Sequence, residues 1–349
     1  MLPWLEPVVQ VRRTLFKTPH TLETFTQVTT VSCGKDFTAC LDDSGNVWTF
    51  GHNNYGQLGC GGGVNTHLTP FKIPELPCIT DIKCGSEHLV LLDEESSLWG
   101  TGRNNQGQLG LGTTPLSSTP CILPNIENVE FISCGLYNTF AITKQGDLFA
   151  CGLNRNNQLG INNTNDITSF VNTKLKDIVS VASGDEHTLF LDSNFKVFGC
   201  GRNYCGQLGL GEVHQVNTPT KLENIEVKQI SCGYFHSLFV DLDGNLFVSG
   251  KVANDTILGR FFISAEKDTS LVVPTKLEGP ESVISMSSGG KHVIVKDAFN
   301  HIWCFGENGY GKLGLGDGYD SKVPEPTCMP EDQSQIIGFR SKAKSARKA

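Results

Sequence analysis

A repeat of about 50 residues constrains this chain more than any other feature of its sequence. The copies are variants of Gly-x-x-His-Thr and a hydrophobic run, followed by Gly-x-Asn-x-x-Gly-Gln-Leu-Gly, and the pattern is clearest within residues 184–209. Phe37 and Asn138 replace the histidine in the first and third copies, and the loop motif is degraded in the fifth. The marker glycines that open the copies are Gly34, Gly85, Gly135, Gly184, Gly233 and Gly289. Six copies at a nearly constant period indicate one large domain built from similar units.

Each copy is predicted to be antiparallel β-structure. Residues 188–191 and 197–201 are short apolar runs separated by a turn, which predicts a tight hairpin. A further strand is expected before the marker glycine (178–182), and a weaker one follows a proline (218–222). Such four-stranded units must stack to bury both faces, so the expected fold class is all-β, a β-propeller of four-stranded blades. A straight β-solenoid, the alternative, would have shorter repeats.

The thirteen cysteines do not indicate a disulfide framework. The slot before the marker glycine holds Cys33, Cys84, Cys134 and Cys232, and equivalent positions in successive units are generally too far apart to pair. We interpret these residues as small buried hydrophobes and expect a reducing compartment. No apolar run approaches the length of a membrane span, and no residue spacing suggests a metal or a cofactor, so we expect none of the three.

The polar residues that recur in every unit are interpreted as structural. The repeated histidines His88, His187, His236 and His292 come one per unit, so they should not converge as metal ligands would. We expect them to bond neighbouring backbone and to pack between blades. In the Gly-x-Asn-x-x-Gly-Gln-Leu-Gly loop we expect positive backbone angles at glycine, and side-chain amides that satisfy buried backbone groups.

These motifs closely resemble those of the regulator of chromosome condensation repeat family, over roughly 300 of the 349 residues. The resemblance implies one blade per repeat, usually seven blades, whereas six repeats are counted here. Either the ring has six blades or the terminal segments supply another one. We favour six. We therefore expect residues 28–330 to form the propeller and residues 331–349 a basic tail. Residues 1–27 would be an N-terminal segment, in which residues 6–11 resemble a post-proline strand and would close the ring on the last blade.

The family's founding members are guanine-nucleotide exchange factors for the small GTPase Ran, and they press one face, including a β-hairpin wedge, on the GTPase. The resemblance thus implies a monomeric Ran-type exchange factor, nuclear or cytoplasmic, that acts without covalent chemistry. Two alternatives stay open: a non-catalytic interaction scaffold, because the same repeats occur in ubiquitin ligases and other adaptors, and an exchange factor for a different small GTPase. A light sensor would need a Trp-dense face, and the chain has only four Trp residues.

Candidate GTPase-binding residues lie in two places. The slot before the repeated histidine holds Asp36, Glu87 and Glu186, with Asp185 beside the last, and we expect these carboxylates on one rim facing a basic partner. They could instead be ordinary solvated carboxylates. The lengthened connection 253–274 is the candidate wedge, and the residues that would contact the partner are Arg260, Phe261 and Phe262. The two phenylalanines could equally be core residues of the worn fifth unit.

The C-terminal tail is the candidate contact to chromatin or nucleic acid. Its basic residues are Arg340, Lys342, Lys344, Arg347 and Lys348. Five positive charges would give a weak, salt-sensitive phosphate interaction or a nuclear-import signal. A solubilising tail is the alternative.

Overall fold

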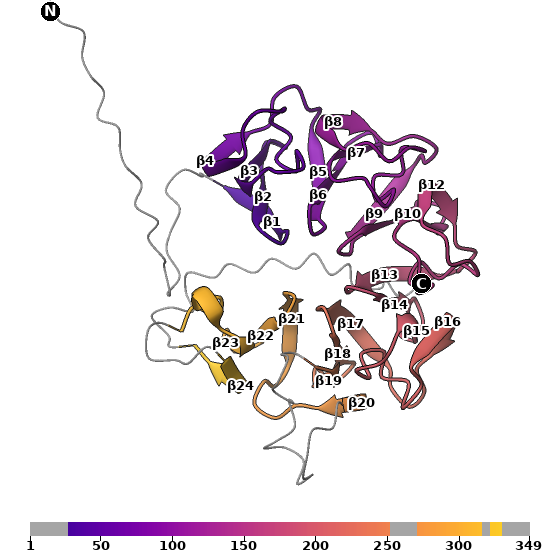
Figure 1. Cartoon of the computed structure of the whole chain (residues 1–349). Helices are drawn as coiled ribbons and strands as arrows, with labels where there is room; N and C mark the ends of the chain where they lie inside the picture. The colour runs from indigo at the N-terminus through magenta and orange to yellow at the C-terminus, as the bar shows by residue number, and fades with distance from the viewer. Residues whose placement is uncertain (1–26, 252–270, 316–321, 330–349) are drawn as a thin grey trace, which may run out of the picture.

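The computed structural model describes residues 27–251, 271–315 and 322–329, and it shows six four-stranded antiparallel sheets arranged around a central axis (Figure 1). Each sheet is one blade and comes from one sequence repeat. In each blade the strands are paired in chain order, from the innermost to the outermost. The predicted fold class, an all-β propeller with six four-stranded blades, is confirmed.

The strands are named in chain order. Blade 1 contains β1 (Val28–Cys33), β2 (Phe37–Asp42), β3 (Val47–His52) and β4 (Thr66–Lys72), and blade 2 contains β5 (Ile79–Cys84), β6 (His88–Asp93), β7 (Leu98–Gly102) and β8 (Ser117–Ile122). Blade 3 contains β9 (Val129–Cys134), β10 (Asn138–Thr143), β11 (Leu148–Gly152) and β12 (Ile167–Asn172), and blade 4 contains β13 (Ile178–Ser183), β14 (His187–Asp192), β15 (Val197–Arg202) and β16 (Gln215–Lys221). Blade 5 contains β17 (Val227–Cys232), β18 (His236–Asp241), β19 (Leu246–Gly250) and β20 (Leu271–Lys276), and blade 6 contains β21 (Val283–Ser288), β22 (His292–Asp297), β23 (Ile302–Glu307), a 3-10 turn η1 (Gly309–Gly311) and β24 (Lys322–Cys328).

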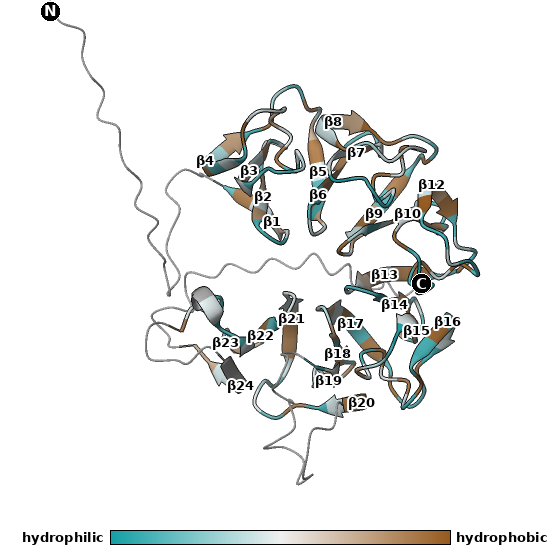
Figure 2. Ribbon diagram, viewed as in Figure 1, coloured by the Kyte–Doolittle hydropathy of each residue, from teal (hydrophilic) through white to brown (hydrophobic). Residues whose placement is uncertain are grey.

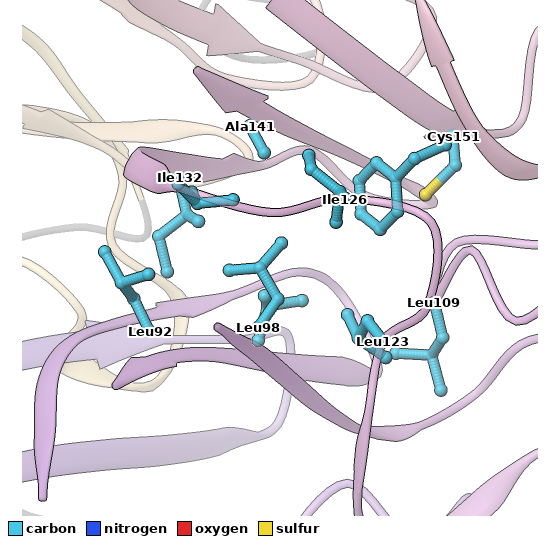
Figure 3. Packing of buried hydrophobic residues seen from close by; sticks show 11 residues of the cluster. Leu92, Leu98, Leu109, Leu123, Ile126, Ile132, Ala141 and Cys151 are labelled. Atoms are coloured by element: carbon cyan, nitrogen blue, oxygen red, sulfur yellow. The ribbon is translucent and has the colours of Figure 1, made fainter. Parts of the chain in front are cut away.

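The hydrophobic core lies between neighbouring blades, because each sheet has two apolar faces and only another blade can cover them. Between blades 2 and 3, Val90, Leu92 and Leu98 pack against Ile132 and Ala141, and all of these side chains are buried (Figure 3). Apolar residues are concentrated on the strands and hydrophilic residues on the loops (Figure 2). The apolar runs predicted as strands are therefore the surfaces that hold the ring together.

The hairpin turn between the second and third strands is organised by an aspartate. Asp93 Oδ1 accepts a hydrogen bond from the N–H of Ser97 (2.8 Å), and its Oδ2 accepts one from Trp99 Nε1 (2.9 Å). Trp48 and Trp303 donate to Asp42 and Asp297 in the same way, at 3.0 Å. Three of the four tryptophans thus have a local structural role in the hairpin.

The Gly-x-Asn-x-x-Gly-Gln-Leu-Gly loop follows the third strand, and its amides do what the sequence predicts. Asn203 Oδ1 accepts from the N–H of Leu208 (2.8 Å), and its Nδ2 donates to the carbonyl of Val213 (2.6 Å). Gly206 and Gly209 have φ of 74° and 71°, where a side chain would be strained. The Asn203 side chain therefore pairs backbone groups of its own loop, which gives this loop a structural role.

The loops of blades 1 to 4 also rest on the outer strand of the next blade. The N–H groups of Gly61, Gly112 and Gly211 donate to carbonyl oxygens in the neighbouring blade at 2.7–2.9 Å. A Cβ at Gly206 would lie 2.6 Å from the Cα of Val272 in β20, so no side chain fits there. The glycine pattern is a record of contacts between units as well as of turns.

The marker glycine and the repeated histidine form the inner contact between blades. A Cβ built on Gly184 would lie 2.4 Å from the carbonyl oxygen of Gly233 in the next blade. The histidine ring reaches a hydroxyl of that next blade: His88 Nε2 lies 3.1 Å from Thr139 Oγ1, and His187 Nε2 lies 3.0 Å from Ser237 Oγ. The rings thus pack between blades, where they contact both a hydroxyl and the backbone of the next blade, at Asn138 for His88 and at His236 for His187.

The repeated cysteines occupy the same inner contact. All cysteines of the described residues are free. The thiols of Cys84, Cys134 and Cys232 each donate to a carbonyl of the preceding blade, at 3.2–3.6 Å. Burial raises the pKa of Cys134 and Cys232 to about 12. Cys33 is exposed and the other three are half-buried, so the interpretation as a buried hydrophobe is wrong for Cys33 and holds only in part for Cys84, Cys134 and Cys232. Desolvation of its thiol nevertheless raises the pKa of Cys33 as well.

The described strands run from residue 28 to residue 328. The fifth blade is complete, although its repeat is the most degraded, because β19 and β20 retain their pairing. β24 fills the fourth-strand position of blade 6 that we expected residues 6–11 to take, while residues 1–26 lie outside the described residues. Among the residues that the structure describes, no helix is long and apolar enough to cross a membrane.

Candidate functional site: the loop face

One end of the propeller carries both the turn before the second strand and the loop after the third strand of every blade. A backbone N–H at the end of the third strand donates to the carbonyl of the residue before the repeated histidine slot, at 2.7–2.9 Å in all six blades. The pairs are His52 to Asp36, Arg103 to Glu87, Leu153 to Tyr137, Arg202 to Glu186, Lys251 to Phe235 and Glu307 to Lys291. We call this end the loop face.

The candidate carboxylates Asp36, Glu87, Asp185 and Glu186 all lie on the loop face. They occupy the turn before the second strand, in blades 1, 2 and 4, and so share one rim of the ring. Asp36 is exposed, whereas the other three are half-buried. Glu87 and Glu186 are each ion-paired with an arginine of their own blade, so their negative charge is already partly neutralised.

Glu87 is held by an arginine that sequence reasoning missed. Arg103 Nη1 donates to Glu87 Oε2 at 2.5 Å. The guanidinium also lies over two aromatic rings, 4.8 Å from the centroid of Tyr55 and 5.4 Å from that of Tyr137. These rings come from blades 1 and 3, so a single cation on blade 2 links three blades. Stacked, half-buried guanidinium groups of this kind are held in a fixed orientation.

A second cluster of the same composition lies on blade 4. Arg202 donates to Glu186, whose other oxygen accepts from Asn156 Nδ2 of blade 3 at 3.1 Å. The guanidinium of Arg202 lies 4.9 Å from the ring centroid of Tyr204. Tyr204 in turn stacks on His214, with centroids 5.1 Å apart, and 58% of the tyrosine is exposed. This cluster therefore offers a flat aromatic surface to solvent.

Asp185 is the carboxylate with the most perturbed ionisation on this face. Burial, and then the neighbouring charge of Glu186, raise the pKa of Asp185 to about 6. The same carboxylate, after burial, raises the pKa of Tyr234 on blade 5. A half-buried acid with a raised pKa marks a place where a positive group from a partner would be favourable.

Blade 6 has opposite charges at the same two positions, with their signs exchanged, although Glu307 is ion-paired there with Lys312. Lys291 takes the position of Glu87, and Glu307 takes that of Arg103, again sixteen residues later in the sequence. Hydrogen bonding from Lys312 Nζ, at 2.9 Å, lowers the pKa of Glu307, and the charge of Lys291 adds to the effect. The sequence therefore held a usable signal for Arg103 and Arg202: opposite charges sixteen residues apart in three repeats.

The ion pairs and stacked rings of the loop face are suited to recognition of a partner. In the described ranges, no group of three His, Cys, Asp or Glu side chains could hold a metal ion. The rings of His88 and His187 are buried between blades, each against a hydroxyl of the next blade. Arginine and tyrosine are, however, the residue types that contribute most to binding at protein interfaces. The loop face is thus a candidate protein-docking surface.

The other candidate residues cannot be placed. Arg260, Phe261 and Phe262 of the proposed wedge lie outside the described residues. The same holds for the tail residues Arg340, Lys342, Lys344, Arg347 and Lys348. Of connection 253–274, the structure describes residues 271–274, which belong to β20.

Comparison with known families matches residues 10–295 to the family described as the RCC1-like domain. This match covers most of the chain and all six repeats begin within it. The chain belongs to the RCC1-like domain family. The RCC1-like propeller accounts for the loop motifs, the marker glycines and the four-stranded blades described above.

Relatives of this RCC1-like propeller include large proteins of different kinds. It is 36% identical to human "Probable E3 ubiquitin-protein ligase HERC4" over 93 residues, which cover 26% of this chain and 9% of that protein. It is 33% identical to the dog "X-linked retinitis pigmentosa GTPase regulator" over 99 residues, with 26% and 9% covered. The chain thus matches only a small part of these proteins.

Among solved structures, Prp20p from Saccharomyces cerevisiae superposes with a TM-score of 0.78 at 24% identity, over 89% of this chain and 79% of that one. At this identity the likeness concerns the fold. That structure was described together with the binding of Prp20p to Gsp1p and histones.

Proposed function

We propose that this RCC1-like propeller is a guanine-nucleotide exchange factor for a Ran-type small GTPase and that it binds the GTPase through the loop face. The observation that carries the proposal is the pair of Glu–Arg–Tyr clusters on blades 2 and 4. Their guanidinium groups are fixed by stacking, and their tyrosines present apolar surface with a polar rim. Family membership and the named activities of relatives, a GTPase regulator and a Gsp1p-binding protein, support the choice of partner.

The mechanism that we propose is non-covalent. Asp36 and Asp185, the two candidate acids outside the Glu–Arg pairs, would compete with bound nucleotide for basic and Mg²⁺-associated groups of the GTPase. Tyr204 and the Arg103 cluster would anchor the partner beside them. Glu87 and Glu186 would then act by orienting their arginines and not by direct charge contact, which changes the role that the sequence alone suggested for them.

The proposal keeps the wedge (Arg260, Phe261 and Phe262) as a second contact and the basic tail as a contact to nucleic acid. It also keeps a nuclear or cytoplasmic location. A second candidate function, a non-catalytic scaffold, is supported by the similarity to part of a ubiquitin ligase. Both functions would use the loop face, so the two are separated by kinetics rather than by binding.

The first test is the release of fluorescent GDP from a purified Ran-type GTPase, with this protein present at catalytic amounts. We expect acceleration by at least two orders of magnitude, since displacement of nucleotide is the activity proposed. A stable complex without acceleration would favour the scaffold function. Absence of both would exclude this GTPase as the partner.

The second test changes one exposed aromatic side chain on the loop face. Tyr204→Ala is expected to lower the exchange rate at limiting enzyme by about tenfold or more, as for an anchor residue at an interface. Phe299→Ala is the matched control: Phe299 is also an exposed aromatic (64%), but it lies in the β22–β23 turn at the opposite end of its blade. We expect the control to stay within twofold of wild type. Equal effects of the two substitutions would place the GTPase elsewhere on the propeller.

A further inference from the structure

A pocket of about 600 Å³ lies between blades 4 and 5. One wall is the β16–β17 connection (222–226), and the other is the outer half of blade 5, with part of β20 and with the β18–β19 turn at the end away from the loop face. Its apolar lining residues are Ile225, Leu242, Phe247, Val273 and Pro274. The volume falls in the range of ligand pockets. We call this space the blade 4–5 pocket.

The pocket lies beside a position where blade 5 lacks an indole ring. The second residue of the third strand is a tryptophan in blades 1, 2 and 6, and each of these tryptophans donates its Nε1–H to the aspartate that ends the second strand. In blade 5 the equivalent residues are Phe247 and Asp241, and both line the pocket. A phenyl ring is smaller than an indole and has no N–H, so the substitution leaves both space and an acceptor.

Asp241 has an acceptor position that its equivalent in blade 1 uses. Asp42 Oδ2 accepts hydrogen bonds from Asn46 Nδ2 and from Trp48 Nε1, both at 3.0 Å. In blade 5 an asparagine donates to Asp241 Oδ2 at 2.7 Å in the same way, but Phe247 cannot supply the second bond. No other side chain of the described ranges donates to this oxygen. The pocket therefore offers a carboxylate oxygen that can accept one further N–H.

The charge around the pocket is negative. Four carboxylates line it, those of Glu223, Glu226, Asp241 and Asp243. Lys221 and Lys196 are bonded to the two glutamates, in partly exposed pairs of the kind that contribute little to stability. A third lysine, Lys228, donates to a backbone carbonyl of the turn at 3.4 Å. Within the part of the chain that the structure describes, the two aspartates have no basic side chain as a partner.

The other blades that have phenylalanine at this position do not repeat the setting. They are blades 3 and 4, with Phe149 and Phe198. Blade 3 has Thr143 in place of the aspartate, and the connection that leads into blade 4 carries Lys174 and Lys176. The combination of phenylalanine, aspartate and an acidic connection occurs only in blade 5, so it is not a requirement of the fold.

We infer that the blade 4–5 pocket binds an arginine side chain presented by a partner polypeptide. A guanidinium N–H would donate to Asp241 Oδ2, in place of the indole N–H of the equivalent blades, and its flat face would lie against Phe247. Leu242 and Val273, which are 44% and 52% exposed, would contact apolar residues next to the arginine. The loop face shows the same combination within the chain, where Arg103 pairs with a glutamate and stacks on two tyrosines.

Arginine fits the pocket better than lysine does, because a planar guanidinium can stack on a ring and donate in its own plane at the same time. The excess of carboxylates selects a cation over a neutral or acidic side chain. The inference does not rest on the proposed function, because the turn that carries Asp241 and Leu242 lies at the end of blade 5 away from the loop face.

The first experiment measures the fluorescence anisotropy of the peptide Gly-Leu-Arg-Val-Gly, labelled with a neutral fluorophore, as full-length protein is added. The control peptide has citrulline, which is neutral and similar in shape, in place of arginine. We expect saturable binding of the arginine peptide and affinity lower by about tenfold or more for the citrulline peptide, since the charge-assisted bond is lost. Equal affinities, or no saturation up to about 0.5 mM protein, would overturn the inference.

The second experiment fills the pocket from within. Phe247→Trp gives blade 5 the tryptophan of blades 1, 2 and 6, and we expect it to weaken binding of the arginine peptide by about tenfold or more. Because this residue is normal at the equivalent positions, the Tm should stay within about 2 °C of wild type or rise. Phe198→Trp is the matched control, since the connection beside it is basic, and its affinity should stay within about twofold of wild type.

A third variant keeps the test decisive if Phe247→Trp lowers the Tm. Asp243→Asn removes one charge from an exposed side chain and should weaken binding of the peptide by about twofold to fivefold without loss of stability. Unchanged binding by Phe247→Trp and Asp243→Asn would place the peptide elsewhere on the propeller. Self-association of the unmodified chain in sedimentation velocity, abolished by Phe247→Trp, would assign the pocket to a second copy and overturn the assignment to a partner.

Discussion

Gly184→Ala is expected to destabilise the protein by about 3 kcal/mol or more, because the inner contact between blades 4 and 5 has no room for one methyl group. The new Cβ would lie 2.2 Å from His187 Cε1 and 2.4 Å from the carbonyl oxygen of Gly233. The backbone of blade 5 would have to move, since the histidine is itself buried and bonded to Ser237. With an unfolding entropy of about 2.1 cal/mol/K per residue, a chain of 349 residues should lose about 4 °C or more in Tm.

The control for this substitution is Gly62→Ala, because nothing lies within 4 Å of a Cβ at Gly62. Its stability should stay within about 0.5 kcal/mol of wild type, as for most surface substitutions. Thermal unfolding followed by circular dichroism compares the two variants directly. A Gly184→Ala protein that melts at the same temperature as wild type would contradict the close approach of neighbouring blades on which the fold is built.

Acid is expected to unfold the protein well above the pH at which carboxylates protonate. Burial lowers the pKa of His88, His187 and His236 to about 3, whereas an unfolded histidine has a pKa near 6.5. The unfolded chain therefore binds protons below about pH 6.5 that the folded chain does not, and stability present above that pH is lost as the pH falls toward about 3. At pH 5.5 each histidine costs about 1.4 kcal/mol, so the three together cost roughly 4 kcal/mol.

Asp185 has the opposite effect on stability. Because its pKa is raised to about 6 in the folded state, folded protein takes up a proton there before unfolded protein does, and stability increases as the pH falls. Urea unfolding between pH 7.5 and 5.5 measures the net slope. His187→Asn, which copies the asparagine found at the equivalent position Asn138 in blade 3, should reduce the loss of stability between pH 7.5 and pH 5.5 by about 1.4 kcal/mol, whatever it does to stability at pH 8. His52→Asn, on an exposed side chain, is the control and should leave the slope unchanged. A stability that is flat over this range would mean that the histidines protonate inside the folded ring.

Much of the fold could be predicted because each repeat contains the same turns, strand pairs and contacts with the next blade. The marker glycine, the hairpin and the amide-rich loop recur wherever backbone geometry demands them, so the sequence reports them several times over. Even blade 5 folds as predicted, since Leu246–Gly250 and Leu271–Lys276 keep the alternation needed for pairing after the loop motif is lost. What the repeat cannot show is how the last unit meets the first, because that junction occurs once.

The candidate site was predicted only in part. The four carboxylates are where the repeated slot put them, but their partners Arg103 and Arg202 were missed. Arg103 stacks on Tyr55, 48 positions earlier in the chain, and on Tyr137, 34 positions later. These residues come together only because the blades are arranged around the propeller axis. Local sequence holds no trace of such a contact. The opposite charges sixteen residues apart, by contrast, were visible in the sequence.

The loops that rest on the neighbouring blade have a consequence for how such a protein can change over evolutionary time. The loop of blade 4 is constrained by β20, a strand of the next repeat, because a Cβ at Gly206 would meet Val272 and the N–H of Gly211 donates to the carbonyl of Val272. A single repeat moved to another position in the ring would no longer match the blades on its two sides. A segment that includes the contact between two blades, with the adjoining half of each blade, would keep that contact intact. We therefore expect recombination within blades to be better tolerated than recombination between blades.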